Sequence, residues 1–265
     1  MKGTIQRLLG RHPRAVAAAG TLFRRLGRHG LAARLIRAAR TQADPVPVWV
    51  PGRRRGAPDF YMDNRGHADQ SACGVWAEGV EGFERPMPAL FFQLALRLPG
   101  AVLDIGANSG LYSLLAAAAG RPCRAFEPFP PARAVLERNV ALNRLESAVA
   151  VDARAVGDRC GQATLFVPLQ DHGLLETSAS LLPGFKERHS STVPVDVITV
   201  DSYCNGNCPP DLMKVDVEGA EAGVLAGARE TLATARPFVF LEVLPQADAA
   251  GIDRIRRELG YRSFR

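Results

Sequence analysis

The sequence predicts an α/β fold in which a mostly parallel β-sheet is covered by helices on both faces. Two observations support this prediction. From Ala101 onward, short apolar stretches alternate with longer stretches whose apolar residues recur at helical spacing, which is typical of βαβ units. The first apolar stretch, "AVLDI", also runs directly into the glycine-rich loop "GANSG", as strands do where the carboxyl edge of a parallel sheet meets a ligand.

The alternating pattern defines the predicted elements in order. Residues 89–98 form a short helix, which Pro99 and Gly100 end. We then expect strands over residues 101–105, 123–128, 148–156, 163–168, 193–201, 212–217 and 238–243. The main helices between and after them are expected over residues 111–120, 131–143, 221–234 and 253–260.

The segment before this domain differs from it in charge. The chain carries a net charge of +6, yet residues 1–43 hold ten Lys or Arg and no acidic residue, so the rest of the chain is slightly acidic. Apolar residues at helical spacing, interrupted by Pro13 and several glycines, predict a basic N-terminal extension of short amphipathic helices. This extension either caps the domain with its charged face in solvent, or contacts an anionic membrane surface or an acidic partner.

Two further ranges complete the predicted domain organisation. Residues 44–88 are rich in Pro and Gly, which predicts a linker followed by irregular structure or a small hairpin. Residues 89–265 form the main domain. The basic charge belongs to the extension rather than to this domain, so it gives little support to a nucleic-acid partner.

The cellular location follows from what the chain lacks. No apolar stretch approaches the roughly 18 residues of a membrane span, and residues 15–23 are too weakly hydrophobic to indicate a signal peptide. Five scattered cysteines do not make a disulfide framework, and Cys204 and Cys208 lack a nearby second pair that would complete a zinc site. We therefore expect a cytoplasmic protein, with contact at a membrane periphery through the N-terminal extension as the alternative.

Four acidic residues fall near the carboxyl ends of predicted strands. They are Asp104, Glu127, Asp216 and Glu242. Because the carboxyl ends of parallel strands meet at one edge of the sheet, we expect these side chains on a single rim, where ligands of open α/β sheets bind. The sequence therefore predicts a ligand site at this rim.

The loop after the first strand indicates which ligand binds there. A dinucleotide-binding loop has the pattern G-x-G-x-x-G, whereas here Asp104 precedes the first glycine and Asn108 replaces the second. A carboxylate would repel a pyrophosphate but suits a ligand with an ammonium group, such as S-adenosylmethionine. Glu127, at the end of the next strand, is then placed to accept both ribose hydroxyls. This pattern disfavours a nucleotide-dependent dehydrogenase.

Several motifs in one order resemble the FkbM family of S-adenosylmethionine-dependent methyltransferases. They are "LDIGANSGLYS", "FEPFP", "ARAVGDRCG", "MKVDVEGAEAGVLAG" and "FLEV", and the resemblance extends from about Gly82 to the C-terminus. It implies a Rossmann-like methyltransferase fold and O-methylation of a hydroxyl on a sugar, glycan or natural product. Residues 1–43 lie outside the resemblance. The chain also ends before the last antiparallel strand usual in this fold, so we expect the sheet edge to be incomplete or built differently.

The resemblance also implies roles for individual residues. Asp216 would border the methyl group and the incoming hydroxyl, Glu127 would bind the ribose, and Asp152 would lie near the adenine. The residues expected at the methionine end of the cofactor are Asp104, Gly106, Asn108 and Gly110. The acceptor pocket is expected to draw on residues 59–88 and 168–193.

The hydroxyl acceptor must lose a proton as it attacks, so a general base is expected near it. Lys214 and Asp216 lie two residues apart on one face of a strand, and the lysine would keep Asp216 ionised. The alternative is an ion pair that only shapes the pocket. A second alternative is Mg²⁺ bound by Asp216, Glu218 and Glu242. His172 is the other candidate base, unless it is an ordinary surface-loop histidine.

Two other functions remain open at this stage. The basic N-terminal extension suggests a nucleic-acid methyltransferase, although "DVEG" stands after the fourth main-sheet strand, where base-modifying enzymes of this fold often have an Asn/Asp-Pro-Pro-aromatic segment. A non-catalytic binding module could also have kept the fold. The set of acidic residues at the rim argues against this last interpretation.

Overall fold

The computed structural model places most of the chain beyond residue 43. It describes residues 44–52, 57–64, 69–169, 178–183, 185 and 189–264. The predicted N-terminal extension and the candidate base His172 lie outside these ranges. The chain divides into two compact units, one formed by residues 1–92 with 173–175 and the other by residues 93–172 with 176–265. Each unit is described by itself below.

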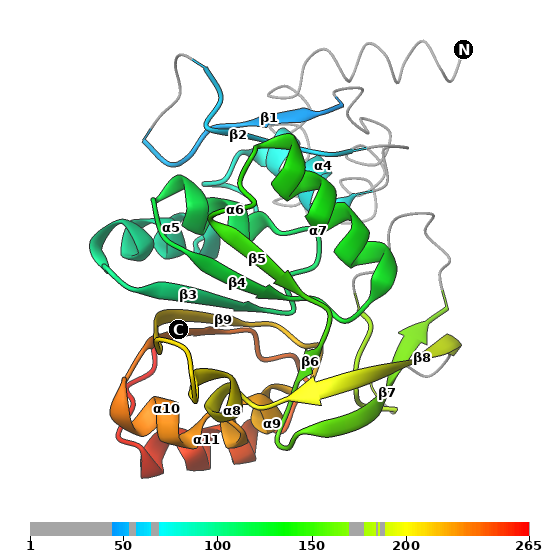
Figure 1. Ribbon diagram of the computed structural model, residues 1–265, viewed down its shortest axis with the longest axis vertical. Helices are drawn as coiled ribbons and strands as arrows, with labels where there is room; N and C mark the ends of the chain where they lie inside the picture. The colour runs from blue at the N-terminus through cyan, green and yellow to red at the C-terminus, as the bar shows by residue number, and fades with distance from the viewer. Residues whose placement is uncertain are drawn as a thin grey trace, which may run out of the picture. The chain divides into compact units, whose positions relative to one another are not determined.

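The first unit contains a two-stranded antiparallel sheet and a helix. Strand β1 (Val46–Val48) pairs with β2 (Phe60–Met62), both drawn in blue in Figure 1. Helix α4 (Gln70–Glu78) begins after Asp69, whose carboxylate accepts a hydrogen bond of 2.6 Å from the backbone N–H of Ala72. The sequence did not predict this helix, because Gly74 interrupts its pattern. The structure gives that glycine a packing role, since a Cβ there would overlap the ring of Phe83.

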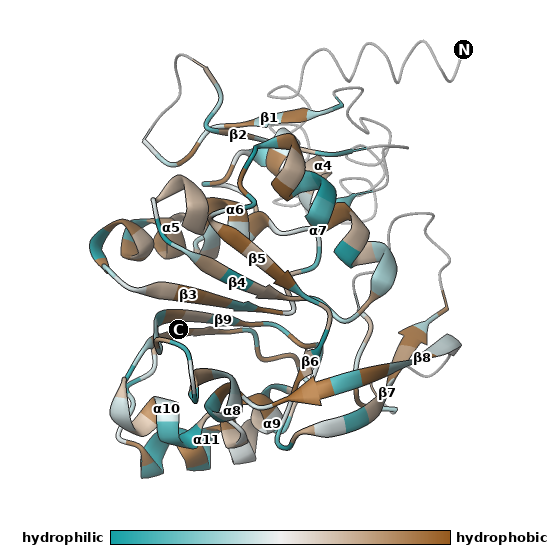
Figure 2. Cartoon of the chain, in the orientation of Figure 1, coloured by the Kyte–Doolittle hydropathy of each residue, from teal (hydrophilic) through white to brown (hydrophobic). Residues whose placement is uncertain are grey.

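The second unit is built on a five-stranded parallel sheet, which confirms the predicted fold class. The strands are β3 (Ala101–Ile105), β4 (Cys123–Phe126), β5 (Val149–Asp152), β9 (Pro210–Val215) and β10 (Phe238–Leu241), arranged in the order β10-β9-β3-β4-β5. These central strands are apolar along most of their length, as Figure 2 shows, because both faces of the sheet are covered. Among the described residues, β10 pairs only with β9 and forms that edge of the sheet.

Helices cover both faces of this sheet (Figure 1). On one face lie α6 (Leu111–Ala118) and α7 (Pro130–Leu142), while α5 (Met87–Arg97) crosses the boundary between the two units. The other face is covered by α8 (Val200–Cys204), α9 (Glu221–Ala226), α10 (Arg229–Thr234) and α11 (Ala249–Glu258). The core on this second face joins Leu103, Met213 and Val215 of the strands to helical residues such as Val224 and Ile255. Within the described ranges, no helix is long and apolar enough to cross a membrane.

The strand order reverses between β3 and β9. From β3 the chain moves outward through β4 and β5, then returns to place β9 and β10 on the other side. The crevice at such a switch point is where open α/β sheets bind ligands. In the register of these two strands, Asp104 lies beside Lys214 and Ile105 beside Val215.

A smaller sheet accounts for one incorrect strand prediction. Residues 148–156 were expected to form a single strand, but β5 ends at Asp152 and β6 (Ala155–Val156) joins a different sheet with β7 (Gly161–Pro168) and β8 (His189–Ile198). The interruption occurs where the guanidinium of Arg154 turns back onto Asp152, with its Nε at 2.9 Å and its Nη2 at 2.7 Å from the carboxylate oxygens. A side-chain contact therefore ends the first strand where the apolar pattern continues.

The predicted helix over residues 221–234 is also divided, into α9 and α10. Gly227 lies between them and packs so closely on the carbonyl of Gly157 that a Cβ would overlap it. Asp201 starts the second helix, because its carboxylate accepts hydrogen bonds from the backbone N–H groups of Glu230 (3.0 Å) and Thr231 (2.8 Å). Contacts with distant parts of the chain thus break a continuous helical pattern.

Candidate active site

The carboxyl ends of the main strands meet at one rim, as predicted. The backbone N–H of Asp216 donates to the carbonyl of Ile105 at 3.0 Å, and that of Glu242 donates to the carbonyl of Val215 at 3.1 Å. On the other side, the N–H of Glu127 donates to the carbonyl of Asp152 at 3.0 Å. These hydrogen bonds extend the parallel strand pairing by one residue, and they fix the backbone positions of Asp216, Glu242 and Glu127.

The glycine-rich loop after β3 has a tight, left-handed backbone. Gly106 has a φ of 78°, Asn108 of 51° and Gly110 of 92°. A Cβ on Gly106 would overlap the carbonyl oxygen of Asp216, and one on Gly110 would overlap the side chain of Leu136. Glycine is therefore needed at both positions for backbone conformation and internal packing. The contact of these two glycines with a cofactor stays a prediction.

Asp104 and Lys214 lie side by side beneath α6. The hydroxyl of Ser113 on that helix donates to Oδ2 of Asp104 at 2.6 Å, and Asp104 is fully buried. Burial raises the pKa of Asp104, and the nearby Lys214 charge and the Ser113 hydroxyl oppose that effect only in part. The Lys214 Nζ lies 4.8 Å from the ring centre of Tyr112, also on α6.

Glu127 is held at the start of the loop that leaves β4. Its Oε2 accepts a hydrogen bond of 2.7 Å from the backbone N–H of Asn108, and its Oε1 accepts one of 2.8 Å from the N–H of Phe129. Burial raises the pKa of Glu127 to about 7, although these two donors favour the ionised form. Each carboxylate oxygen keeps a further lone pair, so the group can still accept from two hydroxyls. The structure thus joins Glu127 to the glycine-rich loop, as a shared cofactor site requires.

Buried oxygen atoms at this loop test which ligand fits. Among the described residues, Oδ1 of Asp104, Oδ1 of Asn108 and the hydroxyl oxygen of Ser109 are buried and have no hydrogen-bond partner. Unpaired buried acceptors are costly, so a ligand that supplies donors is favoured here. S-adenosylmethionine carries an ammonium group and two ribose hydroxyls. A pyrophosphate offers only further acceptors. The residues present fit S-adenosylmethionine better than a dinucleotide.

Asp152 is already engaged by a neighbouring side chain. Its carboxylate pairs with Arg154, and it accepts a further hydrogen bond of 3.1 Å from the Arg154 backbone N–H. Burial alone would raise the pKa of Asp152, but the hydrogen bonds from Arg154 outweigh burial and lower it. The adenine contact expected for Asp152 stays a prediction, and it requires a lone pair that Arg154 leaves free.

Asp216 and Glu242 form a carboxyl pair at the ends of β9 and β10. The Lys214 Nζ lies 2.8 Å from Oδ2 of Asp216, and a hydrogen bond joins Asp216 to Glu242. Partial burial opposes ionisation of Asp216, but the Lys214 charge and the two hydrogen bonds outweigh it and lower the pKa of Asp216. The hydrogen bond with Asp216, together with partial desolvation, raises the pKa of Glu242 to about 8. The two carboxyls therefore favour opposite charge states, with ionisation favoured at Asp216 and opposed at Glu242.

This arrangement bears on the Mg²⁺ alternative. In the part of the chain that the structure describes, no three His, Cys, Asp or Glu side chains are grouped so that they would hold a metal ion. The expectation that Asp216, Glu218 and Glu242 bind Mg²⁺ thus has no support in the described residues.

Comparison with known proteins shows the family of the chain. The family described as "Methyltransferase FkbM domain" matches residues 104–263, which is more than half of the chain. The chain belongs to the FkbM methyltransferase family. It is 33% identical over 160 residues to "Methyltransferase sdnD" of Sordaria araneosa, a match covering 49% of this chain and 60% of that protein.

Two solved structures are also similar to this FkbM family member. The FkbM methyltransferase of Methylobacillus flagellatus is 18% identical with a TM-score of 0.42, covering 60% of this chain and 37% of the other. A SAM-dependent methyltransferase of Agrobacterium tumefaciens is 12% identical with a TM-score of 0.43, covering 80% and 60% respectively. The chain thus spans less than two thirds of the length of each of these relatives.

The structure adds two residues of this FkbM methyltransferase domain that the sequence reasoning missed. Asn139, on α7, is fully buried, and its Nδ2 donates to the carbonyl of Ser109 at 2.7 Å, which fastens the glycine-rich loop. Glu221 is fully buried after β9, where its Oε1 accepts from the N–H groups of Val217 (3.2 Å) and Gly219 (2.9 Å). A polar residue among the apolar positions of the predicted helix 131–143 was the signal available for Asn139. Glu221 was visible only as part of the motif "DVEGAE".

Proposed function

We propose that this protein transfers the methyl group of S-adenosylmethionine to a hydroxyl of a small-molecule or glycan acceptor. The observation that carries the proposal is the Asp216 carboxylate, which lies 2.8 Å from the Lys214 Nζ and whose backbone carbonyl contacts Gly106 of the glycine-rich loop. Membership of the FkbM methyltransferase family supports it. A hydroxyl acceptor must lose a proton as it attacks, and the Asp216 carboxylate is a group of this site that can accept it.

The cofactor side of the site is assigned to the loop and to Glu127. Asp104 and Asn108 offer unpaired acceptors to the methionine end, and Glu127 accepts both ribose hydroxyls. Hydrogen bonds to a charged group contribute about 1.5–3 kcal/mol each. S-adenosylmethionine supplies a methyl group made electrophilic by a positively charged sulfur. The residues around it bind and orient the two reactants, exclude water and accept the hydroxyl proton.

The transfer step places a proton on this chain. Bound S-adenosylmethionine would give its methyl group to the acceptor oxygen and leave as S-adenosylhomocysteine, and the Asp216 carboxylate would accept the hydroxyl proton. The Lys214 Nζ, 2.8 Å from Oδ2 of that carboxylate, favours its ionised form before the step. Positioning of the two reactants provides much of the acceleration. A general base adds about 10²–10⁴-fold.

The test uses isotopically labelled S-adenosylmethionine with cell extract, followed by mass spectrometry of the methylated product. Asp216→Asn should lower methyl incorporation by roughly 10²–10⁴-fold and change the affinity for S-adenosylhomocysteine only modestly. Asp196→Asn is the matched control, because Asp196 is an exposed carboxylate of the same unit. Near-parental incorporation by Asp216→Asn would exclude Asp216 as the base. If the parent protein binds S-adenosylhomocysteine but methylates nothing in the extract, it is a binding module and the proposed function is refuted.

A further inference from the structure

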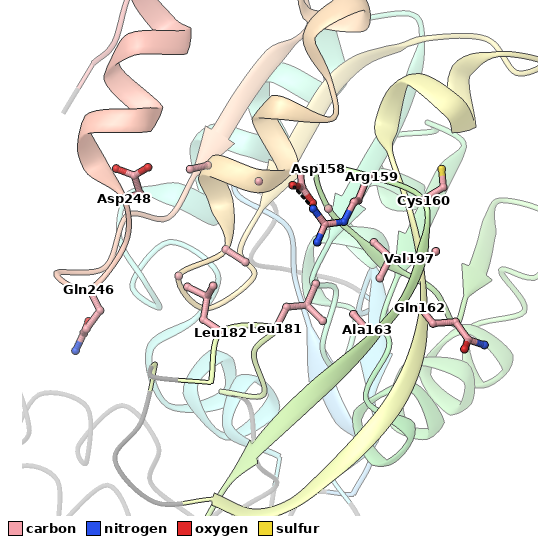
Figure 3. A pocket seen from close by; sticks show the side chains of 16 residues that line it. Asp158, Arg159, Cys160, Gln162, Ala163, Leu181, Leu182, Val197, Gln246 and Asp248 are labelled. Carbon is pink, nitrogen blue, oxygen red and sulfur yellow. Dashed lines mark ion pairs between the residues drawn. The ribbon is translucent and has the colours of Figure 1, made fainter.

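A cavity of about 500 Å³ lies in the same unit as the carboxyl pair, and Figure 3 shows the side chains that line it. Such a volume is within the range of small-molecule sites, about 300–1,000 Å³. Its walls come from the loop between β6 and β7 and the start of β7, from the turn into α9, and from the segment after β10. The described segment before β8 adds Leu181 and Leu182, and β8 itself adds Val197.

The cavity shares two chain segments with the carboxyl pair. Gly219 lines it three residues after Asp216, and Gln246 lines it four residues after Glu242. The wall formed by Leu181 and Leu182 is fastened to the first of these segments, because the hydroxyl of Ser180 donates to the carbonyl of Glu218 at 2.7 Å. The cavity is therefore built onto the same strand ends that carry the proposed base.

The charged groups that line the cavity indicate which molecules it excludes. Arg159 is its one cationic side chain, and it already faces Asp158 with Nη1 3.7 Å from Oδ2. Asp248 adds a second carboxylate, which accepts from the N–H of Gly251 at 2.9 Å. Carboxylates thus outnumber the guanidinium, so a phosphate or carboxylate of an acceptor would face like charges.

The uncharged lining indicates what the cavity accepts. Gln246 carries an amide that both donates and accepts hydrogen bonds, as recognition of hydroxyls requires. Leu181, Leu182 and Val197 provide an apolar surface across from Asp248, as Figure 3 shows. Polar groups set in an apolar wall are typical of sites that orient a small neutral ligand.

We propose that this cavity is the acceptor subsite and that it holds an uncharged, hydroxyl-bearing molecule with one apolar face, excluding phosphorylated acceptors. The proposal rests on the methyltransferase function proposed above. It assigns substrate selection to residues after β6, β9 and β10 rather than to the glycine-rich loop. Blocking the cavity should therefore abolish methylation without affecting cofactor binding.

The test is a matched pair of substitutions on β7. Ala163 lines the cavity, whereas its neighbour Thr164 is exposed and projects from the opposite face of the strand. With labelled S-adenosylmethionine and cell extract, Ala163→Trp should lower methyl incorporation by roughly a hundredfold, since small displacements of a reactant cost that much. Thr164→Trp should stay close to the parent. Both variants should bind S-adenosylhomocysteine as the parent does.

Leu181→Trp provides an independent test from a loop, in case tryptophan in β7 disturbs folding as judged by thermal unfolding. It should give the same loss as Ala163→Trp. Parental incorporation by a folded variant that blocks the cavity would overturn the subsite. The labelled product of the parent should pass through an anion-exchange column at pH 7, and retention there would overturn the exclusion of phosphorylated acceptors. Absence of incorporation by the parent would instead refute the proposed function, on which this inference depends.

Discussion

The affinity of the protein for S-adenosylhomocysteine, the demethylated cofactor, should depend on pH because Glu127 titrates. This carboxyl is buried and has a pKa of about 7, well above its usual value, because burial disfavours its charge. To accept two ribose hydroxyls it must be ionised, and a protonated carboxyl loses at least one of these hydrogen bonds. Below pH 7 the Glu127 carboxyl of the ligand-free protein thus carries a proton. This proton must leave when the ligand binds. Affinity should be full above pH 7 and fall as the pH drops below it.

The size of this effect follows from the pKa. With a pKa of about 7, roughly one carboxyl in eleven is ionised at pH 6, against about ten in eleven at pH 8. The dissociation constant for S-adenosylhomocysteine should therefore rise roughly tenfold between pH 8 and pH 6, which corresponds to about 1.4 kcal/mol. Glu127→Gln removes the titrating group, so its affinity should be weaker at pH 8 and nearly independent of pH across this range.

Isothermal titration calorimetry at pH 6, 7 and 8, at constant ionic strength, measures these constants. Glu137→Gln is the matched control, because Glu137 is an exposed carboxylate on α7, and this variant should keep the parental pH profile. The reasoning would be refuted by a parental affinity that does not change between pH 6 and pH 8. An unchanged pH dependence in Glu127→Gln would assign the titration to another group.

Three further predictions concern the loop and the carboxyl pair. Gly106→Val should destabilise the ligand-free protein by about 1–2 kcal/mol from the left-handed backbone alone, with overlap against Asp216 adding to this, as thermal unfolding will measure. Asn139→Ala should lower stability by about 1–3 kcal/mol and weaken binding of S-adenosylhomocysteine, because the Ser109 carbonyl loses a buried partner. Parental turnover should rise as the pH passes 8, when Glu242 loses its proton and ceases to donate to Asp216, and Glu242→Gln should lack this rise.

Each of these predictions has a contrary outcome. A Gly106→Val protein with parental unfolding temperature but no cofactor binding would show that the glycine contacts the ligand rather than Asp216. If Asn139→Ala retained both stability and affinity, the loop would not depend on α7. A rise in turnover near pH 8 that persists in Glu242→Gln would assign that titration elsewhere. Ala107→Gly serves as the control for the first variant, because it changes the adjacent loop residue without adding a side chain.

Most of the main sheet could be predicted from the sequence because its strands are short apolar stretches buried on both faces. The pattern failed where one particular contact decides the outcome. Arg154 pairs with Asp152, two residues away, where β5 ends, and Gly227 divides a continuous helical pattern because it packs on the distant Gly157. The left-handed loop and the burial of Asp104 beneath α6 likewise depend on partners that are distant in the sequence.

The rim of the candidate site was predictable in position but not in chemistry. The positions follow from strand ends, so Asp216 and Glu242 were expected at one edge. Whether the two carboxyls contact each other, and which of them favours its proton, depends on side-chain direction and on the Lys214 charge. The spacing of apolar residues predicts neither. The roles proposed for the cofactor-binding residues stay predictions, because they concern a ligand that arrives from outside the chain.

The close approach of Gly106 to Asp216 has a consequence for redesign of this protein. Gly106, in the turn assigned to the methyl donor, packs on the backbone carbonyl of Asp216, the proposed base. The distance between the turn and the base is therefore set by a backbone contact and not by an adjustable side chain. A designer who lengthens or shifts that turn also relocates the base. The walls of the cavity come largely from segments outside the central sheet, and Leu181 and Ala163 can be exchanged there without touching this contact. New acceptors are therefore best sought by rebuilding those walls while leaving the loop intact.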